Sequence, residues 1–254
     1  MRRRLLLLAP AATLLAGADR LPVAATPISR MDTPWWRTRH LNKLAELRRG
    51  PVNLIWLGDS ITQDWELDGP EPWRTFSPIW QRFYGDRHAV NLGFKGDSTA
   101  HLLWRMGNGE LDGIEPKAAI VLIGANNLGR VHWNAEQTVA GITAVVADLR
   151  RRLPGTQVLL LGILPSVRSK WATRTTNAVN RTLADRFPRG DAVTFMDLSA
   201  LFLRGVEVDR TQFLDDLLTP PDPPLHPTAQ AQRRIAEAIE PTLVRMLGDR
   251  PRWS

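Results

Sequence analysis

The stretch that decides how the fold is interpreted is Val52-Asn53-Leu54-Ile55-Trp56-Leu57-Gly58-Asp59-Ser60-Ile61-Thr62. Val52–Leu57 is an apolar run of the kind that forms a buried parallel strand. Gly58 lets the chain turn sharply, so Ser60 stands at the carboxyl end of that strand, near the start of a helical segment. A hydroxyl group placed there can act as a nucleophile beside N–H groups that stabilise negative charge. The same pattern suits an ordinary turn in which Ser60 caps the helix.

Further apolar runs alternate with helical patterns along the rest of the chain. The other predicted strands are His88–Leu92, Ala118–Ile123, Gln157–Leu164 and Ala192–Leu198. Helices are predicted over residues 36–49, 78–84, 99–107, 135–153, 173–187 and 228–247. Strands separated by helices of this size imply right-handed crossovers and a parallel sheet covered on both faces. We therefore expect one α/β domain over residues 51–250, with three α/β/α layers and a five-stranded parallel sheet.

The N-terminal segment has the layout of a targeting signal. Arg2–Arg4 is a basic region, Leu5–Leu15 is mostly apolar, and residues 16–18 form an Ala-x-Ala cleavage pattern. Residues 1–18 are therefore predicted to be a secretory signal peptide, too short in its apolar part for an ordinary transmembrane helix. Residues 19–50 are predicted to form an arm and a helix. The mature protein is expected in the periplasm or outside the cell, without stable insertion into a membrane.

Composition excludes several kinds of site. The 254 residues include no Cys, which rules out disulfides, Cys-ligated zinc, iron–sulfur clusters and a thiol nucleophile. Five His make a His-rich metal site unexpected. Removing residues 1–18 deletes three Arg and no acidic residue, so the formal charge falls from +7 to +4. That modest excess indicates a solvated surface, and nucleic acid is not expected as a partner.

Polar residues follow the second and third predicted strands and precede the last helix. Gly96 can present a bare backbone N–H group to a ligand. The side chain of Asn126 can donate a hydrogen bond to an oxyanion, or it can cap a loop. His226 lies in a proline-rich loop just before the last helix. Because ligands bind beyond the carboxyl ends of the strands in such sheets, these residues are candidates for one site with Ser60.

Taken together, these residues resemble the sequence blocks of a known family. Four residues match, in order, the four blocks of the SGNH (GDSL) hydrolases: Ser60 in Gly-Asp-Ser, Gly96 in Gly-Asp-Ser-Thr, Asn126 in Gly-Ala-Asn-Asn and His226 in Leu-His-Pro. Residues 91–111, which include Trp104-Arg105 and Asn108-Gly109-Glu110-Leu111, resemble the catalytic subunits of platelet-activating-factor acetylhydrolase. The resemblance covers residues 52–247. It implies a flavodoxin-like fold and a serine esterase that needs no metal or other cofactor.

The sequence departs from the family around the histidine. The resemblance implies an Asp three residues before His226, but Pro223 occupies that position. Asp222, one residue further back, is the predicted partner that orients His226. A backbone carbonyl group in the same loop could take that role instead. Asp215 and Asp216 are weaker candidates because they lie six or more positions before Asp222.

The chemistry follows from these residue types. A serine hydroxyl group is a poor nucleophile until a base removes its proton, and His226 is the natural base. The N–H groups of Ser60 and Gly96 and the amide of Asn126 could stabilise the resulting oxyanion. We expect an exported serine esterase that hydrolyses short-chain acyl esters, in particular acetyl esters. The expected substrate is a small-molecule or polysaccharide ester, and a homodimer is compatible with the sequence.

Two alternatives from other classes stay open. One is a catalytically inactive carbohydrate-binding or polysaccharide-assembly factor on the same fold. The other is a glycosidase that uses paired carboxylates such as Asp215 and Asp216, although adjacent side chains usually diverge. Several of the ten Trp residues could line a pocket or could pack in the core. The candidates for the pocket are Trp65, Trp73, Trp133 and Trp171.

Overall fold

The protein is a three-layer α/β/α domain built on a five-stranded parallel sheet. The computed structural model describes residues 21–188, 190, 192–217 and 221–252. The strands are β1 (Leu54–Gly58), β2 (Ala89–Gly93), β3 (Ala118–Leu122), β4 (Gln157–Leu161) and β5 (Val193–Met196). Their order in the sheet is β2-β1-β3-β4-β5, which confirms the expected flavodoxin-like arrangement. Every residue of β1 and β3 is buried, as the apolar runs predict.

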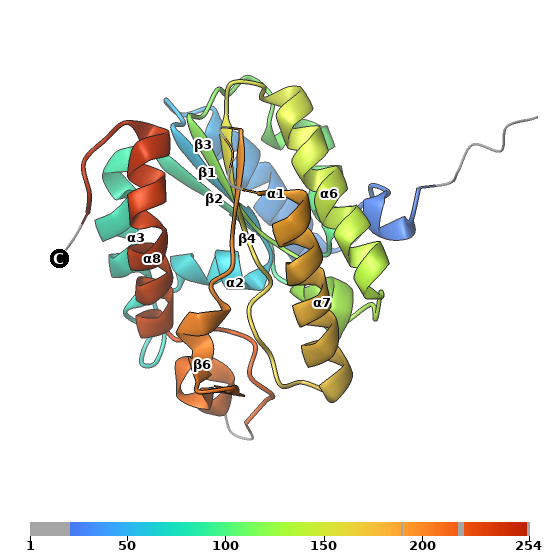
Figure 1. Ribbon diagram of the computed structural model, residues 1–254. Coiled ribbons are helices and arrows are strands. Elements are labelled where there is room, and N and C mark those ends of the chain that lie inside the picture. Colours follow the sequence, from blue (N-terminus) through green and yellow to red (C-terminus); the bar gives the residue numbers. More distant parts are fainter. Residues whose placement is uncertain (1–20, 189, 191, 218–220, 253–254) are drawn as a thin grey trace, which may run out of the picture.

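Helices cover both faces of the sheet (Figure 1). One face carries α3 (Phe76–Tyr84) and α8 (Ala229–Leu247), which contact each other. The other carries α6 (Ala135–Arg152) and α7 (Lys170–Arg186), with α4 (Thr99–Arg105) packed against α6. Helix α1 (Pro34–Leu47) lies beside β2. Two short helices, α2 (Ser60–Gln63) and α5 (Ala125–Gly129), follow β1 and β3 directly; a helical segment was expected near Ser60, whereas α5 was not predicted.

Local side-chain chemistry explains where the long helices begin. Asn134 and Gln137 form a reciprocal capping box at the start of α6. Thr228 accepts a hydrogen bond from the backbone N–H group of Ala231 at the start of α8. These caps fix where each helix leaves the loop region at the carboxyl edge of the sheet.

The expected arm is more than an extended segment. Val23–Ala25 forms a short 3-10 helix that packs against α4 and α6. The Thr99 hydroxyl group donates a 2.7 Å hydrogen bond to the carbonyl oxygen of Ala24, and the Ile28 N–H group donates to that of Ala100 at 3.0 Å. The arm is therefore fastened to the start of α4, next to the loop that contains Gly96.

A small two-stranded antiparallel sheet, β6 (Leu203–Arg204) and β7 (Glu207–Val208), lies between β5 and the loop that carries His226. Among the described residues, no helix combines the length and the apolar character that crossing a membrane requires. The carboxyl ends of β1, β2 and β3 lie side by side, since Gly58 is in register with Gly93 and with Leu122. The loops that follow these three strands therefore begin next to one another, at the point where the strand order reverses.

Candidate active site

Ser60 begins a helix immediately after the first strand. Asp59 is the cap of α2, and its carboxylate accepts a 3.0 Å hydrogen bond from the Ile61 N–H group. The turn requires glycine at position 58, because a Cβ atom there would lie 2.1 Å from the Thr62 hydroxyl oxygen and 2.5 Å from the Leu122 carbonyl oxygen. Ser60 is buried, with 4% of its surface exposed. The tight turn thus presents the hydroxyl group at the carboxyl edge of the sheet.

His226 lies within hydrogen-bonding distance of Ser60. Its Nε2 atom is 3.0 Å from the Ser60 Oγ atom, and its Nδ1 atom is 2.8 Å from an Asp215 carboxylate oxygen. A neutral imidazole that donates from Nδ1 to Asp215 leaves Nε2 free to accept the serine proton. The three side chains therefore form a serine–histidine–aspartate relay.

The structure contradicts the prediction that Asp222 orients His226. Asp222 is exposed, whereas Asp215 is 4% exposed and contacts the imidazole directly. The physical reason is a backbone pairing that the sequence pattern does not reveal. Phe213 and Pro227 form an antiparallel bridge, and the Leu214 N–H group donates to the His226 carbonyl oxygen at 2.7 Å. This pairing brings Asp215 beside His226 although ten residues separate them.

Backbone N–H groups hold the Asp215 carboxylate in place. One of its oxygens accepts hydrogen bonds from the N–H groups of Leu225 at 2.7 Å and His226 at 2.6 Å. Burial raises the pKa of Asp215, but the hydrogen bond to the His226 side chain, the two backbone N–H groups and the charge of His226 outweigh burial, so its pKa lies below the ordinary value. Asp215 is therefore ionised when it meets the imidazole. In the sequence, the signal that could have pointed to Asp215 as the partner of His226 was the acidic pair Asp215-Asp216 after the apolar residues Phe213 and Leu214.

The surrounding charges favour the protonated form of His226. Burial lowers its pKa, but the hydrogen bond to Asp215 and the charges of Asp64, Asp215 and Asp59 outweigh burial. The pKa of His226 consequently lies above its ordinary value of 6.5. A base of this kind is stabilised in the state that it adopts after taking the proton from Ser60.

The two other predicted site residues are linked to each other. Gly96 has a φ of 78°, a left-handed conformation that favours glycine, and it lies in the loop after β2. Asn126 is buried in α5, and its side-chain Nδ2 atom donates a 3.0 Å hydrogen bond to the backbone carbonyl oxygen of Asp97. An amide nitrogen carries two hydrogens, so this bond leaves one for a ligand. The bond from Asn126 to the residue after Gly96 thus joins the loops that follow β2 and β3, although β1 lies between these two strands.

Two further acidic residues of the site were not singled out from the sequence. Burial raises the pKa of Asp59 to about 7, although the hydrogen bond from Ile61 and the charge of His226 act in the opposite direction. Burial likewise raises the pKa of Asp64 to about 6, against the opposing charges of His226 and Lys95. Both carboxyl groups therefore hold their protons more strongly than an exposed aspartate does.

A cavity of about 310 Å³ opens beside the relay. Its lining includes apolar and charged side chains, namely Asp64, Leu67, Trp73, Lys95, Leu214, Asp215, Asp222 and His226. A larger cavity of about 650 Å³, formed by residues 111, 113–117 and 152–156, lies at the amino ends of β3 and β4 and contains no residue of the relay. The smaller cavity is therefore the candidate substrate site.

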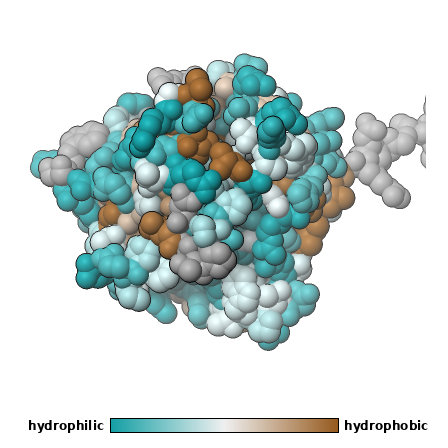
Figure 2. Space-filling view, turned by 90° about the horizontal axis from the view of Figure 1, so that it is seen from below, coloured by the Kyte–Doolittle hydropathy of each residue, from teal (hydrophilic) through white to brown (hydrophobic). Residues whose placement is uncertain are grey.

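The face that carries the ends of the strands is mainly hydrophilic. Figure 2 shows this face with apolar residues gathered in separate small groups among hydrophilic ones. Of the Trp residues proposed for a pocket, Trp73 lines the cavity, whereas Trp65 is fully buried and packs edge-on against Trp56. Trp171 contacts His132, with ring centroids 5.8 Å apart. Within the described part of the chain, His, Cys, Asp and Glu side chains form no group that could hold a metal ion.

Comparisons with known proteins place the chain among relatives of similar sequence. The model of the GDSL-like lipase/acylhydrolase family matches residues 56–234. The platelet-activating factor acetylhydrolase IB subunit alpha2 of Gallus gallus is 32% identical over 233 residues, which cover 91% of this chain and 92% of that protein.

Solved structures share the fold at low identity. A GDSL-like lipase from Bacteroides thetaiotaomicron has a TM-score of 0.60 at 14% identity and covers 82% of this chain and 97% of its own. A carbohydrate esterase of family 3 from Talaromyces cellulolyticus has a TM-score of 0.57 at 18% identity, with 78% and 98% covered.

Proposed function

Because the chain belongs to the GDSL-like lipase/acylhydrolase (SGNH) family of ester hydrolases, we propose that it cleaves short-chain acyl esters, and acetyl esters in particular. The observation that carries the proposal is the relay of Ser60, His226 and Asp215, with contacts of 3.0 and 2.8 Å. Its alignment provides a nucleophile, a base and a carboxylate that holds the base. The proposal that the acyl group is acetyl is supported by the name acetylhydrolase of a relative that matches 91% of the chain.

The reaction follows from the positions of the atoms. As the Ser60 oxygen attacks the ester carbonyl carbon, its proton passes to Nε2 of His226. The negative charge that forms on the carbonyl oxygen would be met by the backbone N–H groups of Ser60 and Gly96 and by the remaining amide hydrogen of Asn126. When the tetrahedral intermediate collapses, His226 returns the proton to the departing alcohol. Water then attacks the acyl-serine with His226 as its base, which releases the acid and restores the hydroxyl group.

The lining of the cavity favours an alcohol part with several hydroxyl groups. Asp64 and Lys95 provide hydrogen-bonding groups, and Trp73 provides an aromatic surface of the kind that packs on a sugar ring. A long apolar chain would leave these charged groups without partners. We therefore propose acetylated carbohydrates rather than lipid esters as the substrates.

A series of p-nitrophenyl esters of increasing chain length, assayed beside acetylated xylan with detection of acetate, tests this proposal. We expect kcat/KM to be highest for the acetate ester and acetate to be released from the polysaccharide. A preference for long acyl chains would contradict the proposed substrate. Failure of the wild-type protein to hydrolyse any ester, with intact binding of a polysaccharide, would instead favour the inactive carbohydrate-binding factor.

The glycosidase alternative requires Asp215 as a free acid or base. Both of its carboxylate oxygens are occupied, one by the imidazole and one by two backbone N–H groups. An aryl glycoside assayed beside an aryl acetate separates the two reactions. We expect hydrolysis of the acetate alone.

Export remains part of the proposal. Residues 1–18 lie outside the described residues, and the order of Arg2–Arg4, the apolar stretch and Ala16-Gly17-Ala18 supports a cleaved signal peptide. N-terminal sequencing of the protein from its native host should find a start near Asp19 in an extracytoplasmic fraction. A cytosolic protein that retains residues 1–18 would contradict export.

A further inference from the structure

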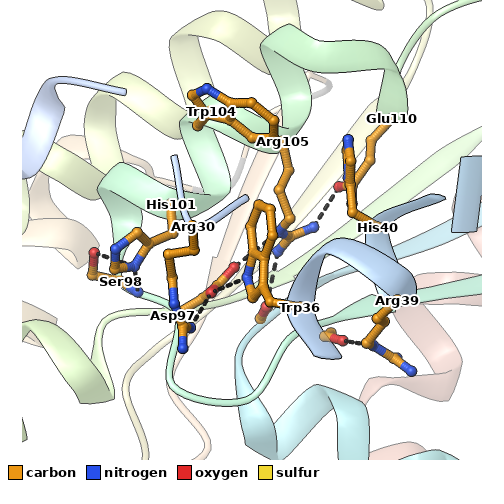
Figure 3. A network of polar contacts seen from close by, with 12 residues as sticks. Arg30, Trp36, Arg39, His40, Asp97, Ser98, His101, Trp104, Arg105 and Glu110 are labelled. Atoms are coloured by element: carbon orange, nitrogen blue, oxygen red, sulfur yellow. Dashed lines mark hydrogen bonds and ion pairs between the residues drawn. The ribbon is translucent and has the colours of Figure 1, made fainter. Parts of the chain in front are cut away.

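Arg105 is a fully buried cation that contacts two loops of the active site. It is the last residue of α4 and has no exposed surface. Its Nε atom donates to an Asp97 carboxylate oxygen at 2.8 Å, and its Nη2 atom donates to the backbone carbonyl oxygen of Gly58 at 3.2 Å. Its Nη1 atom forms an ion pair with Glu110, which is also fully buried. One guanidinium group therefore joins the end of β1, just before Ser60, to the loop that contains Gly96 and Asp97 (Figure 3).

Asp97 gathers more donors than the ion pair alone. Its second carboxylate oxygen accepts from the Trp36 indole N–H group at 2.8 Å and from Arg30 at 2.8 Å. Arg30 also donates to the Lys95 carbonyl oxygen at 3.0 Å, so it clasps the residues on both sides of Gly96. Figure 3 shows Trp36, Arg30 and Arg105 converging on Asp97 from different parts of the chain.

The backbone of Asp97 reaches the third loop. Its carbonyl oxygen accepts the 3.0 Å hydrogen bond from the side-chain amide of Asn126. This bond uses one amide hydrogen and thereby sets the direction of the other. The Arg30 bond to the Lys95 carbonyl oxygen holds the peptide group that carries the Gly96 N–H, and the Asp97 carbonyl oxygen sets where the free amide hydrogen of Asn126 points.

We propose that Asp97 and Arg105 are positioning residues that hold the three donors of the oxyanion hole in one geometry. The proposal rests on the ester hydrolysis proposed above. Through Gly58 the pair fixes the start of the Ser60 turn, through Asp97 it fixes Gly96, and through the Asp97 carbonyl oxygen it orients Asn126. It assigns a role to the Trp-Arg and Asn-Gly-Glu-Leu motifs, which otherwise have no part in the chemistry. Neither residue needs to touch the substrate.

The charges of the cluster support positioning rather than stability as its role. Two arginines, Arg30 and Arg105, face two carboxylates, Asp97 and Glu110, so the formal charges of these four side chains cancel. Burying such ions carries a large desolvation penalty, and well-packed apolar residues often stabilise a protein as well or better. Displacement of a catalytic donor by about 1 Å can instead cost ~10²-fold in rate. A rigid ionic clamp is therefore most useful where geometry decides the rate.

The test compares two buried carboxylates, only one of which lies at the active site. In Asp97→Asn the amide NH₂ group can face the Arg105 N–H donor, which loosens the clamp with little change in size. The control is Glu240→Gln. Glu240 is also fully buried, and it binds the buried Arg87 through two 2.7 Å contacts near the amino end of β2, away from the active site.

We expect Asp97→Asn to lower kcat for p-nitrophenyl acetate about 10- to 100-fold with little change in KM. Glu240→Gln should lose thermal stability to a similar degree but keep the wild-type kcat. In an Asn126→Ala background, Asp97→Asn should lower kcat less than it does alone, because part of its effect passes through Asn126. A wild-type kcat for folded Asp97→Asn, fully additive effects, or an equal loss of kcat in Glu240→Gln would overturn the inference.

Two further measurements keep this test independent of folding and of the choice of substrate. Arg30→Gln removes a donor from a partly exposed side chain of the arm, so the protein should fold, and kcat should fall severalfold. The rate at which a fluorophosphonate probe labels Ser60 should fall in the order wild type, Arg30→Gln, Asp97→Asn. If the wild type is labelled but hydrolyses none of the tested esters, the proposed substrate fails while these labelling rates still decide the inference. Equal labelling rates in all three proteins would refute it.

Discussion

The Nδ1 atom of His226 lies 2.8 Å from a carboxylate oxygen of Asp215 and not beside Asp222, the nearest preceding carboxylate in the sequence. The pairing of Phe213 with Pro227 creates this relationship by running the two segments antiparallel. Asp215 accepts two backbone N–H groups from the same loop, so its carboxylate fixes both the imidazole and the loop that carries it.

Asp215→Asn should reduce kcat by about 10²- to 10⁴-fold, because Asn can stabilise the wrong tautomer of His226 and carries no charge to balance the imidazolium. Asp222→Ala is the matched control from the same cavity and should retain most of the wild-type kcat. Steady-state kinetics of both variants with p-nitrophenyl acetate provide the comparison. The reverse ranking would restore Asp222 as the orienting residue.

The pH dependence should report the pKa of His226. Activity needs the neutral imidazole, so kcat/KM of the wild type should fall as the pH drops through a pKa above 6.5. Asp215 stabilises the protonated ring, so in Asp215→Asn the pKa should decrease and the acid limb should move to lower pH, at a lower maximal rate. Rate profiles of both proteins between about pH 5 and 9 measure this shift around the reference pKa of ~6.5. An acid limb that stays in place would show that another group controls it.

Asn126→Ala should reduce kcat by about 10²- to 10³-fold while KM changes little, since an oxyanion donor acts mainly in the transition state. Among the described contacts, the side-chain amide of Asn126 donates one hydrogen bond, to the Asp97 carbonyl oxygen. Its second amide hydrogen is therefore available for the oxyanion. Measured kcat and KM of the variant distinguish a role in the transition state from a role in substrate binding. A change in KM alone would assign Asn126 to substrate binding.

Asp59→Asn should stabilise the protein at alkaline pH. The pKa of Asp59 is raised from 3.8 to about 7 in the folded state, so the folded chain favours the neutral form. Stability from this group is therefore greatest at low pH and is lost as the pH rises from about 4 to 7. Asn is neutral throughout and can still accept from the Ile61 N–H group. Melting temperatures should favour the variant at pH 8 and approach the wild type near pH 4; a gap of the same size at both values would contradict the raised pKa.

The sheet could be predicted from the sequence because five apolar runs separated by helical patterns leave few other topologies. The predicted strands Gln157–Leu164 and Ala192–Leu198 extend too far, since β4 and β5 end at Leu161 and Met196. Residues such as Ile163, Leu164 and Leu198 remain buried after the ladder of hydrogen bonds ends. Apolar residues indicate burial rather than strand structure, and the buried core extends into the loops at the carboxyl edge of the sheet. The two strands were therefore predicted to be longer than they are.

Some site residues could be placed from the sequence next to them, whereas others depend on contacts between distant segments. Ser60 and Asn126 follow strands directly, so the topology alone brings them to one edge of the sheet. Asp215 meets His226 only through pairing between loop segments, which leaves no periodic signal in the sequence. The cluster around Asp97 joins the arm, the loop after β2 and the end of α4, and depends on contacts between residues up to 67 positions apart.

Labelling with a fluorophosphonate probe, followed by peptide mapping, tests the central claim that Ser60 is the nucleophile. We predict one adduct per chain, located on Ser60, with complete loss of p-nitrophenyl acetate hydrolysis, and neither labelling nor hydrolysis in Ser60→Ala. Circular dichroism should show that the variant keeps the wild-type fold. An adduct on another residue, or near-wild-type turnover by Ser60→Ala, would contradict the account.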